Sequence, residues 1–111
     1  MTEPGRVDAI VILDVAGRLT LEEGAATLRE QVRQQLAAGE RKILVDLSSC
    51  DYIDSAGLGE LATTLIRLQN AGGRFALLGA KKRVRDLLRI SKLLGVFEIF
   101  DDEAHAQAVM K

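Results

Sequence analysis

The residues with the clearest chemical potential lie in the segment 53–61, which reads Ile-Asp-Ser-Ala-Gly-Leu-Gly-Glu-Leu. Apolar residues precede this segment and an amphipathic pattern follows it, so we expect Ser55 near the start of a helix. A glycine inside a helix costs about 0.5–1 kcal/mol relative to alanine. Gly57 and Gly59 in the first turn therefore indicate that another group approaches this backbone closely.

The simplest interpretation of Ser55 is structural. A side-chain oxygen at the N-cap accepts a hydrogen bond from an amide of the first turn and stabilises a helix by about 1 kcal/mol. Either Ser55 or Asp54 can take this position, and the second choice leaves Ser55 inside the first turn. Capping requires neither Gly57 nor Gly59, so it does not explain the whole segment.

A dinucleotide site is a second interpretation, because residues 57–62, Gly-Leu-Gly-Glu-Leu-Ala, match the loose form of the glycine fingerprint. The context argues against it. The preceding apolar run ends near Leu47, whereas the fingerprint needs its glycines directly after a strand. The expected acid about 20 residues onward is missing, and residues 79–82 read Gly-Ala-Lys-Lys there.

A phosphorylation switch at Ser55 is the third interpretation. Phosphate adds roughly −1.5 to −2 charges, and the free amides and positive dipole end of a helix N-terminus tolerate it. A partner packed on this helix start would have to desolvate a dianion, which costs several kcal/mol without a paired cation. About 4 kcal/mol weakens binding roughly a thousandfold. Asp46, Asp51 and Asp54 are expected to add negative charge nearby.

Alternating strands and helices must position this segment. Apolar residues at helical spacing predict helices over 21–38, from Leu58 to a stop at Gly72-Gly73, over 81–93, and from Asp101 onward. Apolar runs predict strands over 7–15, as one strand or a pair of short ones, and over 42–47, 74–78 and 96–100. This order predicts an α/β fold in which helices pack on a small, largely parallel sheet.

The first helix carries the most explicit end signals. We expect Thr20 as its N-cap, Glu22 and Glu23 in its first turn, and Gly39 at its end. Its buried stripe is expected to consist of Leu21, Ala25, Leu28, Val32 and Leu36.

Composition narrows the functional classes. The chain has 111 residues, 48% of them apolar, which suits one domain with its own core. A formal net charge of −1 gives no electrostatic argument for nucleic acid or for an anionic membrane. The single Cys50 is expected to be a buried hydrophobe in a reducing compartment. Because the chain shows no signal-peptide pattern and no apolar run near the roughly 18 residues of a membrane span, we expect a cytoplasmic protein.

Residues with catalytic or metal-binding potential are sparse outside the central segment. His105 is the only histidine and is expected to be solvated. Neither His105 nor Cys50 has companions at ligand spacing, so we expect no metal site and no catalytic residue. Asp46 lacks the acidic neighbours that a phosphoacceptor receiver domain would need.

One helix is strongly basic, and its cations are Lys81, Lys82, Arg83, Arg85, Arg89 and Lys92. We expect them on the solvated face of an amphipathic helix whose inner face carries Val84, Leu87, Leu88 and Ser91. A nucleic-acid surface is the weaker alternative, because few aromatic residues are present to stack on bases. An acidic partner surface is a further alternative for this face.

The stretches Ile43–Ser48 and Tyr52–Gly59 resemble the STAS domain of anti-sigma factor antagonists. Residues 17–19, Gly-Arg-Leu, resemble the family's early Gly-x-Leu, and residues 72–79 resemble its strand after the second helix. Residues 84–88 and 96–101 are similar to its closing helix and edge. This resemblance spans nearly the whole chain. It implies a single STAS domain over residues 1–111, with about four helices on a four- to five-stranded mixed, largely parallel sheet.

The resemblance also implies a role and partners. Such proteins bind an anti-sigma factor that is a serine kinase and thereby release a sigma factor, which regulates transcription. The kinase inactivates them by phosphorylating the motif serine, here Ser55, and a metal-dependent serine phosphatase restores them. Carried onto this chain, the partner-binding residues are Asp54, Ser55, Ala56, Gly57, Leu58 and Gly59. The kinase supplies ATP and magnesium, whereas this domain supplies a hydroxyl, no catalytic group and no cofactor.

This chain departs from the family pattern at three positions. Ala56 stands where many members carry a second Ser or Thr, which leaves Ser55 as the only hydroxyl of the motif. Thr20 replaces a frequent acid, and Ala80 stands where proline is common. An alternative role within the same family is a stand-alone STAS subunit of a lipid-transport ABC complex. The sequence leaves the oligomeric state open.

Overall fold

The computed structural model describes residues 5–7 and 9–111. Within these ranges the central sheet has five strands in the order β1-β2-β4-β6-β7. The strands are β1 (Gly5–Val7), β2 (Ile10–Asp14), β4 (Lys42–Asp46), β6 (Arg74–Leu78) and β7 (Glu98–Phe100). Only the β1–β2 pair is antiparallel, so the predicted mixed, largely parallel sheet is confirmed.

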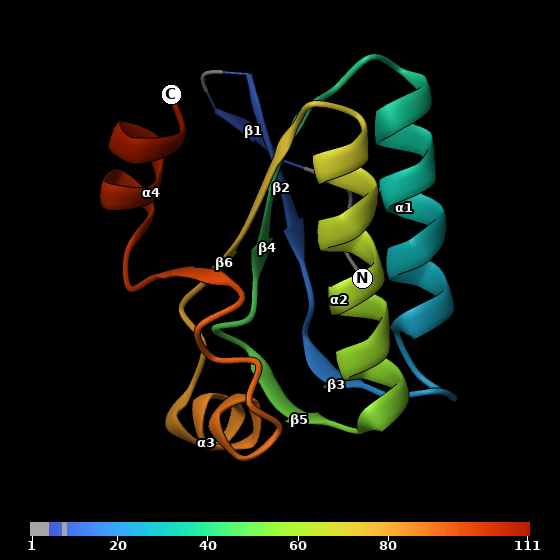
Figure 1. Ribbon diagram of the computed structural model, residues 1–111, viewed down its shortest axis with the longest axis vertical. Helices are drawn as coiled ribbons and strands as arrows, with labels where there is room; N and C mark the ends of the chain where they lie inside the picture. The colour runs from blue at the N-terminus through green and yellow to red at the C-terminus, as the bar shows by residue number, and fades with distance from the viewer. Residues whose placement is uncertain (1–4, 8) are drawn as a thin grey trace.

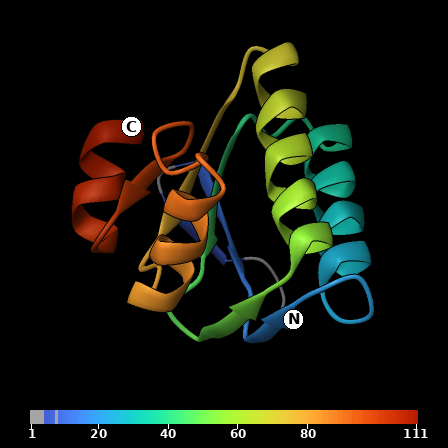
Figure 2. The same ribbon diagram turned by 60° about the horizontal axis from the view of Figure 1, so that its bottom comes forward.

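Four helices pack on this sheet in the described part of the chain: α1 (Ala25–Ala37), α2 (Ser55–Asn70), α3 (Lys82–Ile90) and α4 (Glu103–Met110). Figures 1 and 2 show α1 and α2 side by side on one face, α4 on the opposite face, and α3 at one end of the sheet. None of these helices is long and apolar enough to cross a membrane.

Strand β4 shows why both faces are covered. Ile43 and Val45 belong to the larger core cluster, together with Leu28 of α1 and Leu61 of α2. Leu44, between them, belongs to a smaller cluster with α4. Successive residues of a strand point to opposite faces, so a strand buried on both sides reads as a continuous apolar run.

A second, two-stranded parallel sheet was not predicted. It pairs β3 (Gly17–Leu19) with β5 (Cys50–Ile53). Its strands have three and four residues, too few for a periodic signal in the sequence. Strand β5 leads into α2 after the single residue Asp54. This small sheet therefore presents the start of α2 at one end of the molecule (Figure 1).

The expected start of the first helix is wrong. Helix α1 begins at Ala25, after Gly24, whose φ of 93° is accessible mainly to glycine. Glu22 and Glu23 precede the helix, and Leu21 is 70% exposed rather than buried. Thr20 does not cap α1; its hydroxyl accepts a hydrogen bond from the Glu23 amide at 3.0 Å.

Helix α3 is also shorter than expected, because it ends at Ile90. Val84 and Leu88 are buried and Leu87 is half-buried, as predicted, whereas Ser91 is exposed. Cys50 is fully buried, as expected. His105 is exposed, as expected, and its ring lies edge-on to Phe100 with 5.2 Å between the centroids.

Candidate functional site

The start of α2 assigns separate tasks to two adjacent residues. Asp54 is the N-cap: its Oδ1 accepts a hydrogen bond from the Gly57 amide at 2.8 Å. Its Oδ2 accepts a second one from the Leu21 amide at 3.2 Å. Ser55 is the first residue of the helix and is exposed, and among the described residues no hydrogen bond uses its hydroxyl. The ambiguity between Asp54 and Ser55 as the cap is therefore resolved in favour of Asp54.

The two backbone amides also fix the charge of Asp54. The hydrogen bond from Gly57 is the largest influence and lowers the pKa of the carboxyl, and the Leu21 amide acts in the same direction. Desolvation opposes this shift but does not outweigh it. Asp54 therefore stays ionised at neutral pH, directly beside the Ser55 hydroxyl.

The two glycines of the motif have different surroundings. A Cβ on Gly57 would lie 2.1 Å from the Leu19 carbonyl oxygen and 2.9 Å from Ile53 Cγ2. The group that was predicted to approach the glycines closely therefore belongs, at Gly57, to the chain itself, because α2 packs against β3 there. A Cβ on Gly59 would meet no heavy atom within 4 Å, and Gly59 is exposed.

The positions of Gly57 and Gly59 also argue against the dinucleotide interpretation. The sequence argument that no strand directly precedes the glycines is wrong, because β5 ends at Ile53. The fingerprint nevertheless fails, since Gly57 and Gly59 lie inside α2 and not in a strand-to-helix turn. The space beside Gly57 that a pyrophosphate would need is filled by Leu19.

The predicted partner-binding residues lie together but are not equally accessible. Ser55 and Gly59 are exposed, and Asp54 and Ala56 are half-buried. Gly57 and Leu58 are buried, so they shape the helix start from within and offer little surface.

Two of the three acids that were expected to add negative charge near Ser55 have contacts of their own. Asp51 pairs with Lys81 through a 2.6 Å contact, and this partner lowers the pKa of the Asp51 carboxyl. Asp46 accepts hydrogen bonds from the amide and the hydroxyl of Ser48. The Arg18 guanidinium lies 5.0 Å from the centroid of the Tyr52 ring, and its charge contributes to lowering the pKa of the Asp54 carboxyl.

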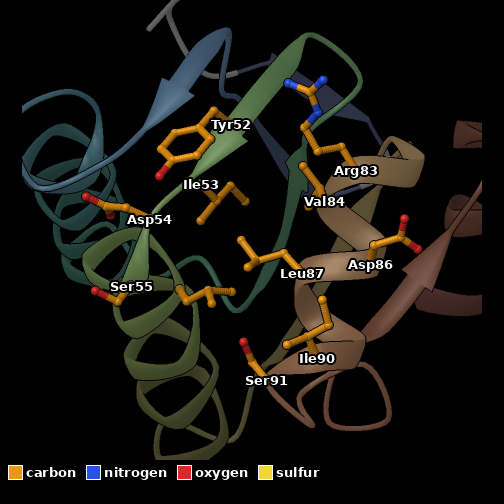
Figure 3. Close-up of a pocket in the computed structure, with 11 residues that line it drawn as sticks. Tyr52, Ile53, Asp54, Ser55, Arg83, Val84, Asp86, Leu87, Ile90 and Ser91 are labelled. Carbon is orange, nitrogen blue, oxygen red and sulfur yellow. The ribbon is translucent and has the colours of Figure 1, made fainter.

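A groove of about 530 Å³ lies between the start of α2 and helix α3. Figure 3 shows Ile53, Val84 and Leu87 pointing toward its middle, with Ser55 on the α2 side and Ser91 on the α3 side. The complete lining is Tyr52, Ile53, Asp54, Ser55, Leu58, Arg83, Val84, Asp86, Leu87, Ile90 and Ser91. Sequence reasoning missed this groove, because it depends on how far apart two helices settle.

One sequence signal pointed toward it. Val84, Leu87 and Ile90 recur at three-residue spacing, which continues an apolar stripe to the end of α3. The last of them, Ile90, is 78% exposed instead of buried. An apolar stripe that continues beyond the part of a helix buried by other elements marks a surface available for contact.

The basic surface of α3 is largely neutralised within the chain. Lys82 and Arg89 both pair with Asp86, Lys81 pairs with Asp51, and Arg85 pairs with Asp101. These ion pairs are compatible with the expected solvated face, although the pairing itself was not predicted. Among the described residues, no cluster of three or more His, Cys, Asp or Glu side chains has the arrangement of a metal site.

The family model of the STAS domain matches residues 2–106 of this chain. A relative from Bordetella bronchiseptica, named "Putative anti-sigma factor antagonist BtrV", is 29% identical over 106 residues, covering 96% of this chain and 90% of its own length. A "Putative anti-sigma factor antagonist TM1081 homolog" from Thermotoga neapolitana is 32% identical over 100 residues, covering 90% of this chain and 88% of its own length.

Solved structures agree with this assignment at the level of the fold. The phosphorylated form of the Bacillus cell fate determinant SpoIIAA superposes with a TM-score of 0.77, at 20% identity, over 98% of each chain. The match to the family model over residues 2–106 shows that the chain belongs to the STAS domain family.

Proposed function

We propose that this chain is an anti-sigma factor antagonist, and that phosphorylation of Ser55 switches off its binding to a serine-kinase anti-sigma factor. One observation carries the proposal: Ser55 is exposed at the first position of α2, and its hydroxyl is free because Asp54 caps the helix. The names of the relatives from Bordetella and Thermotoga support the antagonist role. The alternative role in a lipid-transport complex finds no support among the relatives described above.

The chemistry asked of this chain is small. Ser55 Oγ attacks the γ-phosphorus of ATP held by the kinase with magnesium, and the bond from that phosphorus to the bridging oxygen of ADP breaks. The hydroxyl proton passes to a base of the kinase. The chain contributes only the accepting oxygen, so we infer that it is a substrate and a binding module and not an enzyme. A serine phosphatase reverses the modification by hydrolysis.

Phosphate at this place acts on the partner more than on the fold. The group projects from an exposed residue at a helix start, where the free amides and the helix dipole favour negative charge. The ionised Asp54 beside it raises the local negative charge further. A partner that packs on α2 must then remove several negative charges from water, which opposes binding.

The domain limits belong to the same proposal. Five of the described strands share a central sheet with α1 and α2 on one face and α4 on the other (Figure 1). This arrangement supports one STAS domain over residues 1–111.

A phosphorylation assay tests the proposal directly. The chain is incubated with ATP, magnesium and a purified anti-sigma serine kinase from the same genome, and the modified residue is mapped by mass spectrometry of peptides. We expect phosphate on Ser55 alone and none on the Ser55→Ala variant, which should still bind the kinase. Ser48, Ser49 and Thr63 are internal controls, since all three are also exposed. Phosphate on any of these three instead of Ser55 contradicts the proposal.

A further inference from the structure

The groove between α2 and α3 has the composition of a binding surface. Its interior is apolar, formed by Ile53, Leu58, Val84 and Leu87. Ile90 extends this apolar surface and is 78% exposed at the end of α3. A volume of about 530 Å³ lies within the range in which proteins enclose ligand or side-chain anchors, roughly 300–1,000 Å³.

The rim of the groove carries a positive charge that no ion pair within the described residues neutralises. Lys82 and Arg89 of α3 are tied to Asp86, and Lys81 to Asp51. Arg83 also lines the groove, and it forms no ion pair within the described residues. Its charge contributes to lowering the pKa of Asp51, which already pairs with Lys81. Figure 3 places Arg83 at the edge of the groove, while Asp86 points away from its centre.

The proposed phosphorylation site and the groove form one continuous surface. Asp54 and Ser55 line the groove at its α2 edge, and Figure 3 shows their side-chain oxygen atoms directed away from α3. Leu58, Leu87 and Ile90 line the same groove as Ser55, so they belong to the surface next to it. Charge distinguishes the two sides of the groove, because the α2 side carries the ionised Asp54 and the α3 side carries Arg83.

We propose that this groove anchors the partner kinase by accepting one large apolar side chain, with a neighbouring carboxylate of the kinase pairing with Arg83. This inference rests on the proposed function. Burial of an aliphatic or aromatic side chain supplies affinity, and the carboxylate fixes the direction of the inserted segment. Phosphate on Ser55 then places a dianion at the rim of an apolar anchor site, so that one modification weakens both the contact at α2 and the insertion beside it.

A small probe with the same chemistry tests the groove without the partner. Anilinonaphthalene sulfonate has an apolar aromatic body and one negative charge. We expect its titration into the full chain, followed by amide NMR, to shift the signals of residues 53–58 and 83–91. We expect Ile90→Ser to weaken probe binding about tenfold and Arg83→Gln to weaken it several-fold.

Matched controls lie elsewhere on the surface. Ile66 of α2 is an exposed isoleucine that does not line the groove, so Ile66→Ser should leave probe affinity unchanged. Arg33 of α1 is an exposed arginine outside the groove, so Arg33→Gln should also leave it unchanged. Shifts concentrated on another face, or equal losses in Ile66→Ser and Ile90→Ser, overturn the inference. Unchanged far-ultraviolet circular dichroism verifies that each variant is folded.

The same four variants are then tested against the purified serine kinase by calorimetry. We expect Ile90→Ser and Arg83→Gln to weaken kinase binding about tenfold, with Ile66→Ser and Arg33→Gln at the wild-type level. If the kinase phosphorylates Ser55 but binds all four variants like wild type, the groove inference is wrong and the proposed function stands. If the groove variants lose kinase affinity while Ser55 never receives phosphate, the groove inference stands and the proposed switch by phosphorylation of Ser55 is wrong.

Discussion

Neighbouring residues with similar side-chain chemistry have separate duties at the start of α2. The Asp54 carboxylate accepts two backbone amides, one from its own helix and one from Leu21, more than thirty residues earlier in the chain. The Ser55 hydroxyl is left without an intramolecular task in the described structure. A modification of Ser55 therefore does not remove a hydrogen bond on which the helix depends.

This division predicts opposite sensitivities at positions 54 and 55. Asp54→Ala should lower the thermal midpoint by several degrees, because it removes the N-cap and leaves the Leu21 amide without its acceptor. Ser55→Ala should leave the midpoint within about one degree, as expected for a surface substitution that breaks no contact. Differential scanning calorimetry of both variants measures this, and similar losses in the two would contradict the assignment of the cap.

The Asp54 cap also predicts a pH dependence of stability. Its pKa in the folded chain is lowered from an ordinary value of 3.8, mainly by the Gly57 amide. A lowered carboxyl pKa stabilises the fold fully above the unfolded-state value, and this contribution is lost as the pH falls through the folded-state value. The difference in unfolding free energy between wild type and Asp54→Ala should therefore be constant near neutral pH and shrink below about 3.8. Urea titrations at several pH values measure this; a difference that grows on acidification would contradict it.

The glycines of the motif form a matched pair for a further test at single residues. Gly57→Ala should destabilise the protein by about 1–3 kcal/mol or more, because its Cβ would lie 2.1 Å from the Leu19 carbonyl oxygen. Gly59→Ala should stabilise it by about 0.5–1 kcal/mol, because the new methyl group meets open space inside a helix. Urea unfolding of both variants gives the two values. Equal effects would show that α2 is not held against β3 as described.

At the scale of elements, α1 and α2 are joined by a charged contact as well as by their apolar faces. Glu60 of α2 is only 8% exposed, and its Oε1 accepts a hydrogen bond from Arg29 Nε of α1 at 2.9 Å. Arg67 lies about two turns further along α2, with its Nη1 3.8 Å from Glu60 Oε2. Because Arg29 is about half exposed, solvent weakens this pair relative to a buried one.

A double-mutant cycle measures that contact. Glu60→Gln and Arg29→Ala should each destabilise the chain, and together they should cost less than the sum of the two, with a coupling of about 0.5–1 kcal/mol. Free energies of unfolding in urea provide all four corners of the cycle. Arg33→Ala supplies the control partner, since Arg33 of α1 pairs with Glu30 and does not contact Glu60. Coupling as large with Arg33 as with Arg29 would contradict a specific bond between the helices.

The comparison between sequence and structure is also clearest for elements. Periodicity predicted all four helices and the long strands, because each of these elements has a face that must be buried. It failed at the start of α1, where Leu21 fits the apolar stripe but lies 70% exposed. The backbone of Leu21 is held by Asp54, a contact between distant segments that no local pattern encodes.

The site was predictable only in part, because some of its residues are adjacent in sequence and others are brought together by the fold. The motif around Ser55 is local in sequence, so its residues could be selected before the fold was known. The choice of Asp54 over Ser55 as the cap follows from the backbone, which is extended at Asp54 and helical from Ser55 onward, and both residue types cap helices well. The groove combines residues 52–58 with residues 83–91, and its width follows from the packing of α2 and α3 on the sheet.

At the scale of the whole molecule, Ser55, the proposed phosphorylation site, lies away from the second core cluster. Ser55 is at the end of the molecule formed by β3, β5 and α3, whereas α4 covers the opposite face of the sheet (Figure 2). The larger core cluster lies beneath α1 and α2, and Ser55 is not part of it. Nothing in this arrangement couples a charge on Ser55 to the packing of α4.

Phosphorylation of Ser55 should therefore weaken kinase binding without a change of fold. In Ser55→Asp, and in the chain phosphorylated on Ser55, we expect amide NMR shifts confined to the start of α2 and the facing residues of α3. The thermal midpoint should stay within a few degrees of wild type, since the added charge lies at an exposed helix N-terminus. Kinase affinity should fall roughly a thousandfold for the phosphorylated chain, equivalent to about 4 kcal/mol, and less for Ser55→Asp, which adds a single charge. Shifts that extend to Ala106 and Met110 of α4 would instead indicate a global rearrangement, because these residues are buried on the other side of the sheet.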